Sequence, residues 1–505
     1  MEYLLPAISG ALLALSFPNA DISALAWVSL VPLLYHLKGR TPRQAFMSGL
    51  VAGLVFNLAS IYWIVVTMDD YGGLSFLVSA ALLFLLSGYL ALYIGAFSWL
   101  FSTMDAKRPG WTIVTAPLFW AALELARDHL LSGFPWDLLG YSQHANLGVI
   151  QVSDITGVYG VSALIVLINC AVLDIILIAK KKTPSAIGLV RPAAAFLVLA
   201  AILGYGHWRL RHMPPTVGNL KVALVQGNID QFHKWDPAYQ ADVFDTYKTL
   251  TAQAARERPG LIVWPETATP FYFQDPGRRA ALEALARKSG TYLMTGSPSF
   301  ESAGDGRYTD YNSAYLVSPE GGVAGRYDKM HLVPFGEYVP LKRLLPFVSK
   351  MVTAIGDFGT GSHYTVLKAG DGTFGTAICF EAIFPELVRH FPLAGANFLV
   401  SITNDAWFGR TAAPYQDFDM VVFRAVENRR AIVRAANTGI SGIMLPTGEV
   451  AGSTRIFTTR YMTGDIPLMT GLTFYARHGD VFAYGCMAAS LLFLAAIFLK
   501  RGETR

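Results

Sequence analysis

Apolar runs dominate both ends of this sequence and constrain its fold more than any other feature. Seven runs fall within the first 208 residues, and an eighth follows residue 480. A helix needs about 20 apolar residues to cross the hydrocarbon of a bilayer, so we expect a polytopic membrane α-helical bundle of about eight transmembrane helices. The first two runs are short, which leaves re-entrant or interfacial helices open as alternatives there. The expected helices are Tyr3–Pro18, Ser23–Leu37, Phe46–Met68, Leu74–Phe101, Trp111–Leu130, Val158–Ala179, Arg191–Trp208 and Val481–Leu499.

The composition supports a membrane protein and narrows the expected partners. Hydrophobic residues make up 53% of the chain and charged residues only 15%, whereas soluble domains carry about 25% charged residues. The net charge is a modest +4 and no basic stripe interleaved with aromatic residues occurs, so no nucleic acid partner is expected. Cys170 and Cys486 lie inside apolar runs, which leaves Cys379 without an expected disulfide partner. No Cys/His spacing indicates a zinc site, and we expect neither a metal nor a cofactor.

Basic residues alternate between the loops and predict an orientation. The loops after the expected first, third and fifth helices contain no Lys or Arg, whereas the other short loops and the tail after residue 499 are basic. Because basic loops stay in the cytoplasm, we expect both termini there and the region 219–479 on the opposite face. Arg209, Arg211 and Arg477 are exceptions beside that large region, where the rule is weak. The residues that set the pattern are Lys38, Arg40, Arg43, Lys107, Arg108, Lys180, Lys181, Lys182, Arg191, Lys500, Arg501 and Arg505.

The region between the seventh and eighth runs has a different pattern, in which strand and helix signals alternate. We therefore divide the chain into a transmembrane domain at 1–212, an extracytoplasmic α/β domain at 219–479, and a last helix with its tail at 480–505. Two sheets covered by helices would fit this pattern. The expected strands are Lys221–Gln226, Leu261–Trp264, Tyr292–Thr295, Ala314–Val317, Gly375–Ile378, Phe398–Ile402, Ile432–Ala435 and Gly442–Leu445. The expected helices are Pro237–Arg256, Gly277–Ser289, Pro385–Phe391 and Gln416–Arg430.

Three segments of this region carry residues suited to nucleophilic chemistry. An apolar strand ends at Cys379, another ends in Trp-Pro before Glu266, and Lys329 lies in the segment Tyr-Asp-Lys-Met-His. A carboxylate can take the proton of a thiol, and a fixed ammonium can stabilise an oxyanion. Each residue alone also has an ordinary interpretation. Cys379 would be a small buried hydrophobe, Glu266 a helix cap, and Lys329 a solvated loop residue.

The order of these segments resembles the nitrilase, or carbon–nitrogen hydrolase, superfamily. The extension His-Leu-Val-Pro-Phe-Gly-Glu-Tyr-Val-Pro at 331–340 is similar to the apolipoprotein N-acyltransferases, a membrane family of that superfamily, and the likeness covers almost the whole chain. The resemblance implies a nitrilase-like α-β-β-α sandwich. It assigns Glu266 as general base, Lys329 as oxyanion stabiliser and Cys379 as nucleophile.

The resemblance also implies supporting and substrate-binding residues. Glu337 and Glu381 match family glutamates, and we expect them to support the lysine and the cysteine rather than act as a second base. Phe380 departs from the tyrosine often found after the cysteine, and Trp235 matches a tryptophan that would otherwise be a core or interface aromatic. Residues that we expect to shape the pocket or contact lipid are Trp136, Tyr141, Asn404, Trp407 and Phe408, although Trp136 and Tyr141 also suit an interfacial aromatic belt.

Other polar residues suggest further roles. Glu124, Arg127 and Asp128 lie in an expected span, where ionisable groups pair or face a cavity, and Asp174 is expected to be structural. The stretch 332–361 is rich in Pro, Gly and apolar residues with Lys342, Arg343 and Lys350 interspersed, which suits a lid that dips into the membrane surface or an ordinary surface loop.

Taken as a member of this family, the chain is expected to be a monomeric, multi-pass enzyme of the bacterial inner membrane with its catalytic domain in the periplasm. The resemblance implies ping-pong transfer of an acyl chain from a membrane phospholipid, through a thioester, to the N-terminal amine of a diacylglyceryl-modified apolipoprotein. A membrane-tethered amidase would use the same three residues on a small carbon–nitrogen substrate. A transporter with an outer domain is a second alternative, although paired broken helices are not evident in the sequence.

Overall fold

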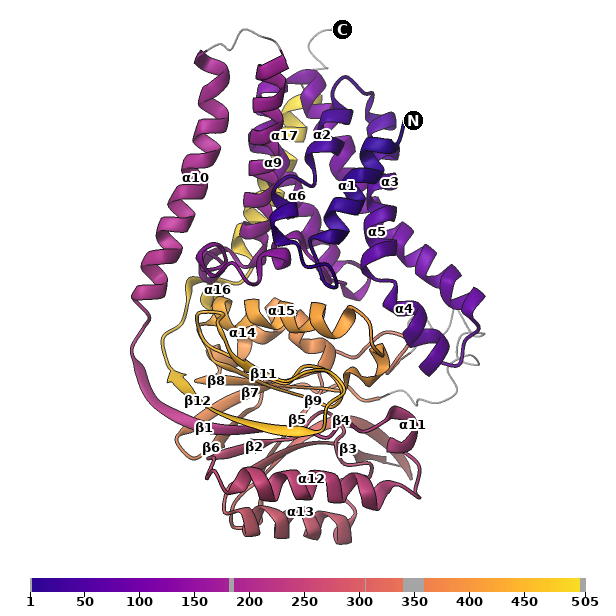
Figure 1. Cartoon of the computed structure of the whole chain (residues 1–505), viewed down its shortest axis with the longest axis vertical. Helices are drawn as coiled ribbons and strands as arrows, with labels where there is room; N and C mark the ends of the chain where they lie inside the picture. The colour runs from indigo at the N-terminus through magenta and orange to yellow at the C-terminus, as the bar shows by residue number, and fades with distance from the viewer. Residues whose placement is uncertain (1, 181–185, 305, 339–357, 500–505) are drawn as a thin grey trace.

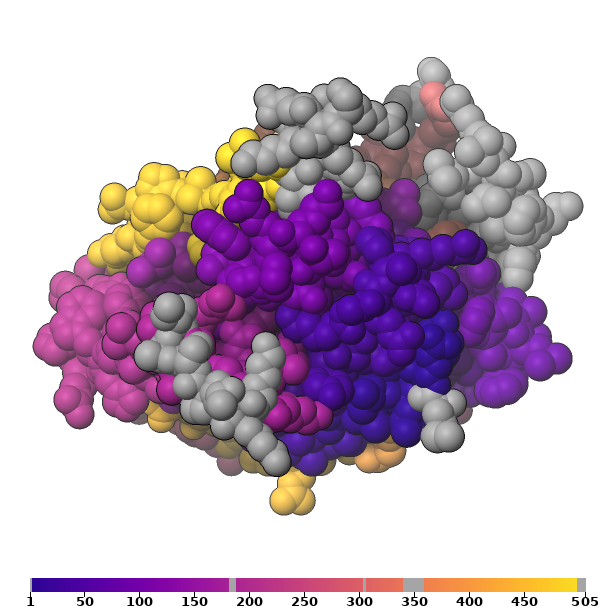
Figure 2. Space-filling model, turned by 90° about the horizontal axis from the view of Figure 1, so that it is seen from above, coloured from indigo at the N-terminus to yellow at the C-terminus, as the bar shows by residue number. Residues whose placement is uncertain are grey.

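The computed structural model describes residues 2–180, 186–304, 306–338 and 358–499. A helical part stands above a part built of two sheets and their covering helices (Figure 1). In the view from above, the indigo-to-magenta helical part hides most of the orange chain beneath it (Figure 2). The main helices of this part are α1 (Leu4–Leu15), α2 (Val31–Leu37), α3 (Pro42–Ser60), α4 (Trp63–Val66), α5 (Phe76–Lys107), α6 (Thr112–His129), α9 (Val158–Lys180), α10 (Ala186–Arg211) and α17 (Val481–Leu499).

Three helices among the described residues are long and apolar enough to cross a membrane: Phe76–Lys107, Val158–Lys180 and Gly188–Arg211. The bent pair Pro42–Ser60 and Trp63–Tyr71 would make a fourth. Helices are thus present at all eight expected positions, but length and composition support only three or four full crossings. Four further apolar helices have at most 17 residues in the part of the chain that was searched, against the roughly 20 that a crossing needs: Leu4–Leu15, Ser23–Leu37, Leu147–Thr156 and Val481–Ala496.

The expected span Phe46–Met68 is not one straight helix, because the chain bends by 50° between Pro42–Ser60 and Trp63–Tyr71, which makes this stretch a broken span or a re-entrant loop. Just after the bend, the Trp63 indole donates a hydrogen bond to Gln416, and the Tyr62 hydroxyl accepts one from the main-chain N–H of Ala412. Both partners belong to the sheet-containing part. The bend therefore turns two aromatic side chains out of the helical bundle and onto the neighbouring layer.

Glycines allow α3 and α5 to approach closely. A Cβ added at Gly53 would lie 2.7 Å from the Cα of Ala91, and one at Gly49 would collide with the carbonyl oxygen of Ile94. No side chain fits in that space. Small residues at such contacts are typical of helix packing within membranes, where close backbone approach replaces the hydrophobic drive of water.

Two six-stranded sheets form the lower part of the molecule. Their strand orders are β12-β1-β2-β3-β4-β5 and β11-β10-β9-β8-β7-β6. In each sheet three successive strands run parallel, β1-β2-β3 and β7-β8-β9, and the flanking strands are antiparallel. The strands are β1 (Thr216–Gln226), β2 (Leu261–Val263), β3 (Tyr292–Gly304), β4 (Arg307–Val317), β5 (Val323–Asp328), β6 (Val366–Ala369), β7 (Gly372–Ile378), β8 (Phe398–Thr403), β9 (Ile432–Ala436), β10 (Gly442–Met444), β11 (Val450–Ser453) and β12 (Arg460–Met469).

Helices cover both outer faces of the paired sheets. Helices α12 (Gln240–Ala255) and α13 (Pro276–Ser289) lie on the first sheet, and α14 (Pro385–Leu393) and α15 (Ala413–Asn428) lie between the second sheet and the membrane helices (Figure 1). Side chains of β2 alternate accordingly: Ile262 packs with the α12 and α13 cluster, whereas Leu261 and Val263 join the core between the sheets. The α-β-β-α sandwich is therefore present as expected.

Four strands were not predicted from the sequence: β5, β6, β11 and β12. All lie at or next to a sheet edge, and β11 and most of β12 are exposed or half-buried. Edge strands do not need the continuous apolar run that identifies a buried strand. Of the lid-like stretch 332–361, residues 339–357 lie outside the described part of the chain, so the lid expectation and its Lys342, Arg343 and Lys350 are not tested.

Candidate active site

The ends of four strands bring the chemistry-bearing residues together. Glu266 follows β2, Cys379 follows β7 and Asn404 follows β8, each at the carboxyl end of a parallel strand, while Lys329 follows β5. Open α/β sheets place their sites at such ends. Because the two sheets pack face to face, residues from both sheets meet at this edge.

Glu266 is buried and its carboxylate is held from several sides. Its Oε1 atom accepts a hydrogen bond of 2.7 Å from the side-chain amide of Asn312 and lies 3.6 Å from the Nζ atom of Lys329. Its Oε2 atom accepts one of 2.9 Å from the main-chain N–H of Asn404. The expected pocket-edge residue Asn404 thus contacts the expected base through its backbone. These contacts fix the direction of the carboxylate.

The buried Lys329 forms an ion pair with the half-buried Glu337 beside Glu266. The Nζ atom of Lys329 lies 2.9 Å from the Oε2 atom of Glu337, which also accepts a 2.8 Å hydrogen bond from the N–H of Val333. Burial lowers the pKa of Lys329, but the charges of Glu337 and Glu266 outweigh this, and the net pKa lies above the ordinary value. Lys329 therefore stays a fixed ammonium, as an oxyanion stabiliser must.

Cys379 lies at a sharp turn between β7 and the short 3-10 helix η7 (Cys379–Ile383), in the left-handed conformation with φ of 54°. A nucleophile on a strained turn after a strand is presented above the sheet edge. Burial raises the pKa of the Cys379 thiol, and the Glu266 carboxylate raises it further. Lys329 and a hydrogen bond with Thr403 oppose the rise. The thiol is therefore protonated at rest and lies within electrostatic reach of both expected partners.

Glu381 joins the cysteine turn to the lysine loop. Its Oε2 atom accepts a 2.7 Å hydrogen bond from the N–H of Ile378, and its Oε1 atom accepts bonds from Tyr327 OH and from the N–H groups of Met330 and His331. The side chain is fully buried. Burial raises the pKa of Glu381 to about 7, although the N–H of Ile378 and the charge of Lys329 lower it. One carboxylate thus joins the turn at Cys379 to the loop after Lys329.

Several residues that contact these groups were not expected from the sequence. Asn312, on β4, donates to both Glu266 and Glu337 at 2.7 and 3.0 Å. Thr403, which bonds with Cys379, donates to Asp405 at 2.7 Å, and the buried guanidinium of Arg434 binds Asp405 and Asp417. The sequence signal of Asn312, Thr403 and Arg434 is only a polar residue within a buried strand, which does not reveal what it faces, and Asp417 lies in helix α15.

The remaining expected aromatic residues pack against other aromatic side chains or lie at the surface. Phe380 packs edge-on against Phe384, with ring centroids 5.0 Å apart, and Trp407 packs edge-on against Tyr71 of the membrane part. Phe408 contacts Trp63 in the same way. Trp235 is 47% exposed at the end of the short helix α11 (Gln231–Lys234). The ring contacts of Phe380, Trp407 and Phe408 are thus with other aromatic side chains and not with Glu266, Lys329 or Cys379.

Trp136 and Tyr141 are buried, so their side chains are not exposed to lipid in this conformation. The Trp136 indole donates a 2.8 Å hydrogen bond to Gln416, which also accepts one from Trp63. The Tyr141 hydroxyl accepts one from the buried Arg424 of α15. Both residues join the loop at 133–143 to the helix that covers the second sheet.

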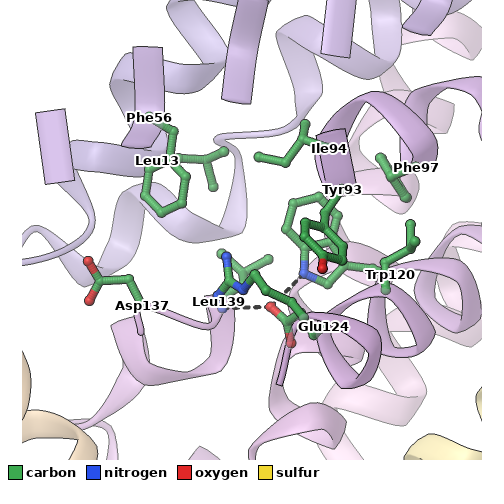
Figure 3. Close-up of a pocket in the computed structure, with 11 residues that line it drawn as sticks. Leu13, Phe56, Tyr93, Ile94, Phe97, Trp120, Glu124, Asp137 and Leu139 are labelled. Carbon is green, nitrogen blue, oxygen red and sulfur yellow. Dashed lines mark hydrogen bonds between the residues drawn. The ribbon is translucent and has the colours of Figure 1, made fainter. Parts of the chain in front are cut away.

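A small cavity of about 30 Å³ lies among the membrane helices, and Glu124 and Arg127 contribute to its lining (Figure 3). Glu124 accepts hydrogen bonds from Trp120 and from the N–H of Leu139 through Oε1, and its Oε2 atom has no partner among the described residues. Arg127 donates to the carbonyl of Trp136. A space of this size accommodates about one water molecule. Asp128 accepts a bond from Tyr159, and Asp174 is half-buried.

Two groups of side chains in the described part of the chain could hold a metal ion: Asp21 with His144 and Asp419, and Asp128 with His129 and Asp480. Neither group includes Glu266, Lys329 or Cys379. The cluster itself offers a thiol, a carboxylate and an ammonium, which are the parts needed for nucleophilic attack on an acyl carbon.

Comparison with known proteins gives a consistent result along the chain. The model of the apolipoprotein N-acyltransferase N-terminal domain matches residues 9–171, and the carbon–nitrogen hydrolase model matches residues 221–471. The chain is 46% identical to the apolipoprotein N-acyltransferase of Geobacter metallireducens, with 99% of this chain and 96% of that protein covered. It is 32% identical to that of Chlorobaculum tepidum, with 99% and 97% covered.

Among solved structures, an amidase from Nesterenkonia sp. is similar to this chain at 21% identity, with a TM-score of 0.38 over 51% of this chain and 95% of the amidase. Nit3 of Saccharomyces cerevisiae, a member of the nitrilase superfamily, matches at 19% identity with a TM-score of 0.40, over 50% of this chain and 91% of Nit3.

Proposed function

The chain belongs to the apolipoprotein N-acyltransferase family, and we propose that Cys379, Glu266 and Lys329 carry out its acyl transfer. Members of this family are bacterial membrane acyltransferases whose substrates are phospholipids and lipoproteins. The observation that supports the assignment is the meeting of these three residues at one edge of the sandwich, with the thiol on a strained turn where both the Glu266 carboxylate and the Lys329 ammonium act on it.

In the first half of the proposed reaction, Glu266 takes the proton from Cys379 and the thiolate attacks the ester carbonyl carbon of a membrane phospholipid. The Lys329 ammonium stabilises the oxyanion of the tetrahedral intermediate. The C–O bond then breaks, the leaving oxygen takes the proton from Glu266, and a lysophospholipid departs. Cys379 remains as a thioester.

In the second half, the N-terminal amine of a diacylglyceryl-modified apolipoprotein attacks the thioester carbon. The C–N bond forms as the C–S bond breaks, and the amine proton passes through Glu266 to the departing thiolate of Cys379. Glu337 keeps Lys329 charged, and Glu381 holds the two loops in register. The enzyme returns to its starting state, so neither a metal nor a cofactor enters the scheme.

The same proposal gives the chain an orientation and an extent for each domain. We divide the chain into domains at 1–212, 219–479 and 480–505, and the family matches at 9–171 and 221–471 support the first two of these. The absence of Lys and Arg from the alternate loops supports cytoplasmic termini and a sandwich on the periplasmic face of the inner membrane. We propose eight membrane helices, some short, and a monomer. Both substrates carry acyl chains that leave lipid only at high cost, which suits a site in a domain that packs against the membrane helices (Figure 1).

The test is the intact mass of the purified protein after incubation with a defined phospholipid and no acceptor. We expect a gain of one acyl chain that hydroxylamine removes and that Cys379→Ser lacks. Cys170→Ser serves as the matched control, since that buried thiol lies in α9. A folded wild-type protein that gains no mass, yet hydrolyses soluble amides, would contradict the proposal and favour a membrane-tethered amidase.

A further inference from the structure

A second buried lysine lies beside the proposed base. Lys234 is the last residue of α11, and only 2% of its surface is exposed. Its Nζ atom donates to the main-chain carbonyl of Glu266 at 3.3 Å and to the hydroxyl of Thr267 at 2.5 Å. Lysine is rarely buried without a paired carboxylate, and both of these partners are neutral oxygens. Such a residue is costly for stability, and the contacts suggest a role at the site.

The backbone of α11 is fixed firmly enough to place this side chain. Asp230 caps the helix through hydrogen bonds from the N–H groups of Phe232 and His233. The buried side chain of Gln231 accepts a 2.8 Å hydrogen bond from Asn404, whose own N–H binds the Glu266 carboxylate. Helix α11 is therefore tied to the same residue that orients the base.

The turn that Lys234 contacts is strained. Thr267 has φ of 43°, in the left-handed region that β-branched residues avoid. Such a conformation persists only where the surroundings hold it. Lys234 binds one residue on each side of the Glu266–Thr267 peptide, and so it holds the turn that directs the carboxylate toward Cys379.

Lys234 also changes the balance of charge around the thiol. Burial lowers the pKa of Lys234 to about 8, and the negative charges of Glu266 and Cys379 raise it. Because the interaction of two charges is mutual, the ammonium stabilises negative charge on both groups. Glu266 and Glu337 bring two carboxylates to the site, and Lys329 balances only one of them.

We propose that Lys234 is a positioning residue of the acyl transfer, which holds the Glu266–Thr267 turn and stabilises negative charge at Cys379. This inference rests on the proposed function, since it assumes that Cys379 attacks and that Glu266 takes its proton. Lys234 acts on those groups and needs no contact with the substrate.

The experiment compares Lys234→Met and Lys234→Arg with the full-length wild-type protein in detergent. One measurement is the rate of acyl-enzyme formation from a defined phospholipid, and the other is the rate of Cys379 alkylation by iodoacetamide between about pH 6 and pH 10, located by peptide mass. We expect Lys234→Met to form the thioester about 100-fold more slowly and its alkylation profile to move to higher pH. Lys234→Arg keeps the charge and should recover much of both. Lys248→Met, at an exposed position of α12, is the matched control.

Acyl-enzyme formation by Lys234→Met within twofold of the wild-type rate would overturn the inference. So would equal losses in the Met and Arg variants with an unchanged alkylation profile, since that pattern indicates a purely structural role. If the wild type itself forms no thioester while alkylation still depends on Lys234, the proposed function fails and the effect on the thiol stands. Thr267→Val keeps the shape of the side chain and removes the hydroxyl that Lys234 binds. Its rate of acyl-enzyme formation should fall less than that of Lys234→Met, and it tests the same contact if Lys234→Met does not fold.

Discussion

The side-chain amide of Asn312 donates a 2.7 Å hydrogen bond to the carboxylate of Glu266. The same nitrogen donates to Glu337 at 3.0 Å, so one amide bridges two carboxylates whose charges repel each other. A neutral donor is the right group there, because it contributes hydrogen bonds without adding charge.

Asn312→Asp should therefore damage the site although the shape of the side chain is kept. A third carboxylate between two others raises the pKa values of all three, so the three carboxylates together retain a proton. Glu266 must be free of that proton before it can act as a base. We expect acyl-enzyme formation to slow by about 100-fold near neutral pH. The intact-mass assay measures this rate. Asn219→Asp, at an exposed position of β1, is the control, and equal rates in the two variants would contradict the expected repulsion.

Glu266 and Cys379 could be selected from the sequence alone, whereas Asn312 and Lys234 could not. The first two each follow a buried apolar strand, and the order of their segments resembles a known superfamily. The other two carry no such signal, since each is a single polar residue whose partners are distant in the chain. Their contacts arise only when the two sheets pack. The roles of all these residues stay predictions.

The fold was predictable to a similar extent. Buried strands such as β8 have a continuous apolar run, and the sandwich follows from their alternation with helices. The bend after Ser60 was not predictable, because the sequence there is apolar on both sides and the contact just after it is with the distant Gln416. Edge strands such as β11 lacked an apolar run and were missed.

Glu337→Gln should weaken the site through its effect on Lys329. The variant keeps the size of the side chain but leaves the buried ammonium with Glu266 alone, at 3.6 Å. Removing one partner of a buried ion pair costs about 3 kcal/mol, which should appear as a lower thermal unfolding midpoint in detergent. Acyl-enzyme formation should fall as well. Without the charge of Glu337 the pKa of Lys329 is lower than in the wild type, so the ammonium loses its proton at a lower pH than it does there. Glu301→Gln, at the exposed partner of Arg326, should change neither quantity.

The pH dependence of acyl-enzyme formation should show an alkaline limb near pH 8. Lys234 has a folded-state pKa of about 8, below its ordinary value of 10.5, so it loses its proton in the folded protein first. As the pH rises through 8, the positive charge beside Glu266 and Cys379 disappears and the rate should fall. Lys329, whose pKa is raised, stays charged throughout. Initial rates across this range measure the limb, and a limb that persists unchanged in Lys234→Met would assign it to another group.

The free energy of unfolding should change in the opposite direction to the rate, and should rise with pH over the same range. The folded state binds fewer protons than the unfolded state between pH 8 and 10.5, so the contribution of Lys234 to stability is present above 10.5 and is lost as the pH falls through 8. Thermal unfolding midpoints of the wild type and Lys234→Met, measured at several pH values in this window, should therefore diverge as the pH falls.

Gln416→Leu should weaken the contact between the sandwich and the membrane helices. Its Oε1 atom accepts hydrogen bonds from the indoles of Trp63 and Trp136, and its amide donates to the carbonyl of Ser60. Leucine leaves two buried N–H donors without partners, at about 1–3 kcal/mol each. We expect a lower unfolding midpoint and faster proteolysis. Gln253→Leu, on the exposed face of α12, is the control and should resemble the wild type.

Glu381→Gln should distinguish a supporting residue from a second base. Glu381 accepts four hydrogen bonds, and a glutamine would turn its NH₂ group toward at least one donor, so the two catalytic loops should lose their register. A supporting role predicts a lower rate of acyl-enzyme formation with the pH profile unchanged in shape. Because the pKa of Glu381 is about 7, a second base would instead contribute an acid limb near that pH, which the variant would lose. Glu266→Gln, measured in parallel, should lose the activity at every pH.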